Sequence, residues 1–147
     1  YRLKGILEGA QMVSEKLGCP VIYPIHPRTK KMIEKFDLQI NSNIHLVEPL
    51  GFLDFIYLQK NAKLVLTDSG GLQEESCILK VPCITLRDNT ERPETVDVGS
   101  NLLAGTDPKD ILNKTLEILE RKNNWSNPFG DGHSSKYIID HIDSLSQ

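Results

Sequence analysis

The sequence of 147 residues lacks several features that define whole classes of protein. It has no apolar run near the roughly 18 to 20 residues that span a bilayer. No basic segment precedes an apolar stretch, so no secretory leader is predicted. Positive charge is not in excess, because Lys and Arg total 17 against 20 Asp and Glu. These absences predict a cytoplasmic protein with neither nucleic acid nor membrane as a partner.

Cysteine is also scarce, at three residues, and no C-x-x-C motif is present. Cys19, Cys77 and Cys83 have apolar neighbours, which predicts reduced thiols in the core of a cytoplasmic protein. No grouping of His, Cys and carboxylate residues has the spacing of a metal-ligand set. The sequence therefore predicts no metal and no cofactor.

Hydrophobic patterning, in contrast, is strong and alternates between two kinds of element. Apolar runs predict strands at 20–25, 44–47, 62–67, 82–86 and 101–104. Helical periodicity predicts helices at 1–17, 28–36, 53–60, 72–79, 107–122 and 134–145, with a helical turn at 93–98. This order is typical of an α/β domain with a doubly wound parallel sheet and helices on both faces.

The chain begins with a helix, which in this architecture normally follows a strand. We therefore expect a first strand to precede residue 1, and the 147 residues to be one domain of a longer polypeptide.

The most informative local pattern is the turn Asp68-Ser69-Gly70-Gly71 between a buried strand and a helix. Glycine lets the backbone approach a ligand closely, and free N–H groups at a helix start favour an anion such as phosphate. Glu75 lies one turn further on, where its carboxylate could accept hydrogen bonds from ribose hydroxyls. The alternatives are a capped turn and a solvated glutamate.

Three other residues occupy comparable positions. His26 and Arg92 follow strands and could contact phosphate, and Phe55 lies on a helix where it could stack on a base. A structural histidine, a loop salt bridge and core packing are the respective alternatives. Because the carboxyl ends of parallel strands share one edge of a sheet, His26, Ser69 and Arg92 together favour a diphosphate site.

Four motifs, in this order, resemble the hydrolysing and non-hydrolysing UDP-N-acetylglucosamine 2-epimerases. They are Tyr23-Pro-Ile-His-Pro27, Thr67-Asp-Ser-Gly-Gly-Leu-Gln-Glu-Glu75, Leu86-Arg-Asp-Asn-Thr-Glu-Arg-Pro-Glu-Thr95 and Asn127-Pro-Phe-Gly-Asp-Gly132. The resemblance implies half of a glycosyltransferase-B architecture, in which two Rossmann-like domains enclose the active site. Residues 1–147 would be the C-terminal, UDP-binding domain, without its first strand.

The resemblance also implies roles for the candidate residues. His26 would act near the UDP phosphates as a catalytic group, and Phe55 would lie beside the uracil. Ser69, Gly70 and Gly71 would bind the diphosphate. Glu75 would bind the ribose, and Arg92 would bind phosphate. The positive groups would stabilise the departing UDP.

The implied reaction interconverts UDP-N-acetylglucosamine and UDP-N-acetylmannosamine by elimination and re-addition of UDP, in the setting of cell-envelope polysaccharides. The implied partners are UDP, UDP-N-acetylhexosamine, the N-terminal domain and a second subunit in a homodimer. The acidic groups acting at C2 belong to the N-terminal half, so we expect little turnover from these 147 residues alone. For the same reason, these residues do not distinguish the hydrolysing from the non-hydrolysing enzymes. The alternatives are the donor domain of a sugar-nucleotide glycosyltransferase and a non-enzymatic interaction domain with a degenerate nucleotide pocket.

One departure from the family pattern concerns the end of the helix at 72–79. Many members have Ala-Pro and then Gly-Lys-Pro, where this chain has Ser76-Cys77 and Lys80-Val81-Pro82. These positions form the body and exit of the helix, so we expect nucleotide binding to persist.

Overall fold

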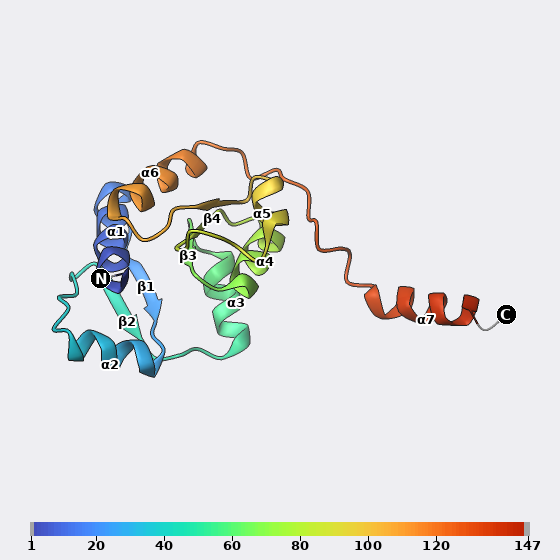
Figure 1. Cartoon of the computed structure of the whole chain (residues 1–147), viewed down its shortest axis with the longest axis horizontal. Helices are drawn as coiled ribbons and strands as arrows, with labels where there is room; N and C mark the ends of the chain where they lie inside the picture. Colours follow the sequence, from blue (N-terminus) through green and yellow to red (C-terminus); the bar gives the residue numbers. More distant parts are fainter. Residues whose placement is uncertain (1, 146–147) are drawn as a thin grey trace.

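The computed structural model describes residues 2–145, which form alternating helices and strands (Figure 1). The helices are α1 (Arg2–Leu17), α2 (Pro27–Lys35), α3 (Phe52–Lys60), α4 (Gly70–Leu79), α5 (Pro93–Asp97), α6 (Pro108–Leu119) and α7 (Ser134–Leu145). The strands are β1 (Val21–Pro24), β2 (Ile44–Val47), β3 (Val65–Thr67), β4 (Cys83–Thr85) and β5 (Asn101–Leu103). The predicted order is confirmed throughout. Most strands are shorter than predicted, and α4 begins two residues earlier, at Gly70.

All strand pairs are parallel, as predicted, but the strands form two hydrogen-bonded sheets. In the first sheet Val21 of β1 lies opposite Ile44 of β2. In the second, β4 is central, with Val65 and Asn101 on either side of Cys83. Each connection between paired strands carries a helix or a helical turn, which is the arrangement that parallel strands require.

The main core lies between the second sheet and the pair α1 and α6, which pack against each other (Figure 1). Its buried residues are apolar: Val13, Ile84, Leu86, Ala104, Ile111 and Ile118. Helix α4 packs against β3 and β4, and α3 packs against α4. Helices therefore cover both faces of the sheet, and the carboxyl ends of the strands are left to loops.

A close approach of α1 to α6 depends on Gly9. A Cβ atom at this position would lie 2.7 Å from Cδ1 and 3.0 Å from Cβ of Ile111. Ile111 has no exposed surface. The glycine is therefore needed for the helices to pack at this separation, because interiors are already close-packed.

The segment after α6 is anchored to α4 by Trp125, whose Nε1 donates a 2.9 Å hydrogen bond to the carbonyl of Cys77. Beyond it the chain extends away from the sheets, and α7 lies apart from them (Figure 1). Within residues 2–145, no helix combines the length and hydropathy that crossing a bilayer requires.

The three cysteines are free, as predicted. Cys77 and Cys83 are fully buried, and burial raises the pKa of the Cys83 thiol to about 12. Cys19 is only half-buried, because it lies in the turn between α1 and β1.

Candidate functional site

The amino end of α4 has the features that an anion site needs. Ser69 precedes the helix with an extended backbone, and its hydroxyl makes no capping hydrogen bond. The Ser69 N–H instead donates to Oγ1 of Thr67, at 3.0 Å. Within residues 2–145, no partner is found for the N–H groups of Gly70, Gly71 and Leu72. Free N–H groups and the positive end of the helix dipole are thus presented together.

Arg92 lies against this helix start. A Cβ atom at Gly70 would lie 3.7 Å from both Cγ and Cζ of Arg92, so the arginine side chain lies beside the first residue of α4. The Nε of Arg92 donates to the carboxylate of Glu74, and Nη1 donates to the carbonyl of Glu91 at 2.9 Å. The guanidinium is therefore held on two sides.

Glu74 is a residue that sequence reasoning missed. Its ion pair with Arg92 spans 18 residues of sequence. A weak signal exists, because a strand-end arginine and a first-turn glutamate in neighbouring β–α units share one edge of the sheet. Arg87 and Glu91 form a second ion pair, and their side chains approach to 3.5 Å.

Glu75 lies on α4 and Phe55 on α3, two helices that Gln59 joins. The amide of Gln59 donates to the carbonyl of Leu72 at 3.3 Å and to the hydroxyl of Ser76 at 3.0 Å, which joins α3 to α4. Burial raises the pKa of Glu75, Gln59 opposes this shift and Glu74 adds to it. Phe55 is half-buried, one turn before Gln59 on the same face of α3. Both candidates therefore lie on the adjoining faces of α3 and α4.

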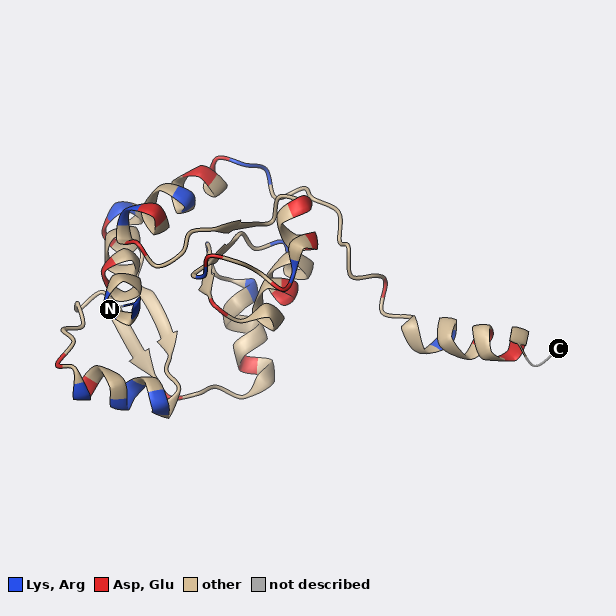
Figure 2. Ribbon diagram, in the orientation of Figure 1, with Lys and Arg blue, Asp and Glu red and all other residues tan. Residues whose placement is uncertain are grey.

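His26 lies at the carboxyl end of β1, where it precedes α2. Its Nδ1 accepts the N–H of Arg28 at 3.2 Å, so the neutral ring carries its proton on Nε2. The side chain is exposed, which leaves Nε2–H accessible as a donor. The adjoining α2 is the helix most densely covered with Lys and Arg (Figure 2).

The structure brings some of the predicted residues into contact and leaves one apart. Arg92 lies beside Gly70, and Ser69 and Gly71 are the neighbours of Gly70 along the chain. Among the described residues, His26 makes no hydrogen bond to this group, because it belongs to the first sheet and the group to the second. Burial raises the pKa of Tyr23 on β1, a hydrogen bond with Thr29 opposes this shift, and the charge of Asp68 adds to it.

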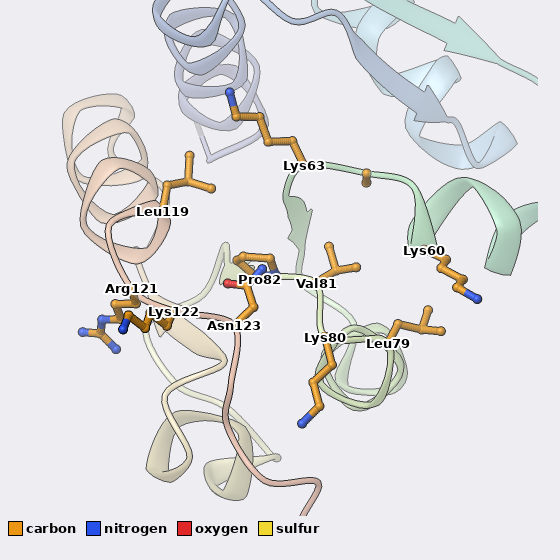
Figure 3. A pocket seen from close by; sticks show the side chains of 11 residues that line it. Lys60, Lys63, Leu79, Lys80, Val81, Pro82, Leu119, Arg121, Lys122 and Asn123 are labelled. Carbon is orange, nitrogen blue, oxygen red and sulfur yellow. The ribbon is translucent and has the colours of Figure 1, made fainter.

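A hollow of about 680 Å³ lies elsewhere, where α3, α4 and α6 end (Figure 3). Five of its lining residues are basic: Lys60, Lys63, Lys80, Arg121 and Lys122. Arg121 is paired with Glu117 at 2.6 Å, and Lys80 donates to the carbonyl of Trp125. These positive charges offset the partial negative charge of three helix ends, which accounts for the cluster without a ligand. Among residues 2–145, no three metal-ligating side chains come together.

Comparison with known proteins identifies relatives over nearly the whole chain. A family model described as UDP-N-acetylglucosamine 2-epimerase matches residues 1–143. The UDP-N-acetylglucosamine 2-epimerase of Methanocaldococcus jannaschii is 56% identical over 143 residues, which are 94% of this chain and 39% of the relative. That of Methanococcus maripaludis is 52% identical over 141 residues, 93% of this chain and 38% of the relative.

Solved structures of UDP-GlcNAc 2-epimerases also match this chain. The crystal structure of the M. jannaschii enzyme in complex with UDP-GlcNAc and UDP superimposes with a TM-score of 0.89 at 50% identity. The match covers 97% of this chain and 41% of that one. A UDP-GlcNAc 2-epimerase from Neisseria meningitidis bound to UDP-GlcNAc matches with a TM-score of 0.81 at 33% identity, over 96% and 40% of the two chains. The chain thus spans about two fifths of the length of these relatives.

Proposed function

Because this chain belongs to the UDP-N-acetylglucosamine 2-epimerase family, we propose that it binds UDP at the amino end of α4. The N–H groups of Gly70 and Gly71, the hydroxyl of Ser69 and the guanidinium of Arg92 contact the diphosphate. Glu75 accepts hydrogen bonds from the ribose, and Phe55 packs beside the uracil. His26 donates from Nε2 to the phosphates.

One observation carries this proposal, namely the position of Arg92 beside Gly70 at the start of α4. A guanidinium and backbone N–H groups that have no partner within residues 2–145 therefore lie near each other. Each recognises phosphate oxygens, the first in a fixed fork and the second along the helix axis. The raised pKa of Glu75 indicates that its carboxylate is partly withdrawn from water, as a hydrogen-bond acceptor in a binding site would be.

We further propose that the whole protein interconverts UDP-N-acetylglucosamine and UDP-N-acetylmannosamine, by eliminating UDP and adding it back. The departing UDP gains negative charge as the bond to the sugar breaks. Arg92, His26 and the start of α4 would stabilise that charge where it develops. The acid and base acting on the sugar would come from an N-terminal domain and not from these residues, so this chain alone would turn over little substrate.

The topology supports assigning residues 1–147 to the C-terminal domain of such an enzyme. In a doubly wound sheet, the first strand lies at the centre, between the second strand and the fourth. Here β1 and β3 border the two separate sheets, and a preceding strand would fit between them. With that strand in place, the two sheets of this domain would form one. We also propose that the full protein works as a homodimer and resides in the cytoplasm, where free buried thiols are stable.

Calorimetric titration of the chain with UDP tests the site. Glu75→Ala and Arg92→Ala should each weaken binding about tenfold or more, because each removes charge-assisted hydrogen bonds. Glu117→Ala and Arg121→Ala, which break an ion pair on α6, are matched controls and should leave affinity unchanged. Unchanged UDP affinity in both site variants would refute the assignment.

A second measurement addresses the reaction. The chain mixed with UDP-N-acetylglucosamine should bind it but form no UDP-N-acetylmannosamine detectable by proton NMR. Turnover by the 147 residues alone would contradict the assignment of the C2 chemistry to another domain.

A further inference from the structure

A buried group of polar side chains lies directly behind Arg92. Gln73 is 1% exposed, and Thr85, Thr95 and Asn101 have no exposed surface. The Oε1 of Gln73 accepts from the hydroxyl of Thr90 and, at 3.3 Å, from Nδ2 of Asn101. Oδ1 of Asn101 in turn accepts from the hydroxyl of Thr85 at 2.9 Å. The group connects α4, β4, β5 and the loop that carries Arg92.

Both backbone polar groups of Arg92 are bonded to this network. The Arg92 N–H donates to Oγ1 of Thr90 at 2.9 Å, and the Arg92 carbonyl accepts from the hydroxyl of Thr95 at 2.7 Å. Asn101 donates from Nδ2 to Oγ1 of Thr95 at 3.0 Å, and Gln73 links Asn101 to the hydroxyl of Thr90. Arg92 has φ −128° and ψ 61°, outside helix and strand, and these bonds therefore define its backbone position.

The direction of each bond follows from the donors and acceptors available. Asn101 uses both amide hydrogens, on Gln73 and Thr95, and the Thr90 hydroxyl donates to Gln73 while accepting from Arg92. A buried network with these bonds favours one arrangement, whereas an apolar cluster of the same volume would tolerate several. This arrangement supports the half-buried Arg92 side chain beside Gly70.

We propose that Gln73, Thr90 and Asn101 are positioning residues, which hold Arg92 in place for the diphosphate of UDP. The proposal rests on the proposed function, because it concerns the same site. Binding of the nucleotide then requires no ordering of the loop at 86–92, and the affinity gained in this way is lost when the network is cut.

Thr90 offers the cleanest test, because it is only half-buried and valine has its shape. Thr90→Val removes the donor to Gln73 and the acceptor for the Arg92 N–H, and should weaken UDP binding about tenfold. Thr90→Ser keeps the hydroxyl and should stay within about twofold of the wild-type affinity. Thr115→Val on α6 is a matched control and should not change the affinity.

A double-mutant cycle separates positioning from a general structural effect. If Thr90 acts through Arg92, Thr90→Val should weaken binding far less when Arg92→Ala is already present. An equal loss in both backgrounds, or wild-type affinity for Thr90→Val alone, would overturn the positioning role. Circular dichroism melting of each variant confirms that a folded protein is being titrated.

The outcomes also distinguish this proposal from the proposed function. Loss of affinity in Arg92→Ala without loss in Thr90→Val would leave the UDP site intact and refute only the network's role. Absence of UDP binding by the wild-type chain, or normal binding by both Arg92→Ala and Glu75→Ala, would refute the site itself.

Discussion

Two opposing effects on the free energy of unfolding meet at Lys80, namely a strained backbone and the stabilising contacts of its side chain. It closes α4 in the left-handed region, with φ 62° and ψ 32°. A residue with a Cβ atom loses roughly 1–2 kcal/mol in this conformation. Its ammonium lies 5.7 Å from the centre of the Trp125 ring and donates to the Trp125 carbonyl. At a partly exposed site the ring contact contributes about 0.5–1 kcal/mol, and the hydrogen bond a similar amount.

Two substitutions separate these effects. Lys80→Ala loses both contacts and keeps the strain, so its free energy of unfolding should fall by about 1–2 kcal/mol. Lys80→Gly loses the same contacts but relieves the strain, against about 0.4–1 kcal/mol lost through the more flexible unfolded chain. The glycine variant should therefore be more stable than the alanine variant by about 0.5–1 kcal/mol, and closer to the wild type.

Urea unfolding provides the measurement. Trp125 is the single tryptophan of the sequence and is buried, so its fluorescence reports the transition directly. An alanine variant as stable as the glycine variant would refute the strain. Wild-type stability in both variants would show that the contacts with Trp125 contribute nothing.

Three further outcomes are expected. Gly9→Ala should lower the free energy of unfolding by about 1 kcal/mol, because overpacking against Ile111 outweighs the gain in helix propensity. In urea unfolding, adding Ile111→Val should recover part of this loss. Thr115→Val should raise the free energy of unfolding by about 1 kcal/mol, because the buried Thr115 hydroxyl has no hydrogen-bond partner within residues 2–145. A lower melting temperature of Thr115→Val would contradict this reasoning. UDP affinity should fall as pH drops through the raised pKa of Glu75, because the protonated carboxyl accepts ribose hydrogen bonds poorly, and titrations of Glu75→Gln should lack this component.

Features encoded within a few residues could be predicted from the sequence. The helix predicted at 107–122 begins as expected, with Asp107 as its N-cap: the carboxylate accepts the N–H groups of Lys109 and Asp110 at 2.9 and 3.2 Å. The helix predicted at 1–17 ends at Leu17, and Gly18 follows it with φ 61°. Such signals are reliable because capping and left-handed turns involve neighbours along the chain.

Contacts between distant segments could not be predicted in the same way. The bond from Asn101 to Gln73 spans 28 residues, and the pair formed by Arg92 and Glu74 spans 18. Both depend on which strands lie side by side and at what register. Alternation of strands and helices predicts a parallel sheet, but it does not specify the opposing residues. The strand-end rule therefore identified Arg92 as a candidate without identifying the side chains that orient it.

The separation of His26 from the α4 site has the same topological origin. His26 follows β1, whose sheet ends at that strand, and Arg92 depends on the sheet of β3, β4 and β5. The alternation of strands and helices predicted one continuous sheet, in which His26 and Arg92 would lie at the same edge. The gap between β1 and β3 is where a first strand would pair with both, and its hydrogen bonds would fix the two sheets in one register. We therefore expect the contribution of His26 to UDP binding to depend on that strand, whereas those of Arg92 and Gly70 depend on contacts already made within this chain.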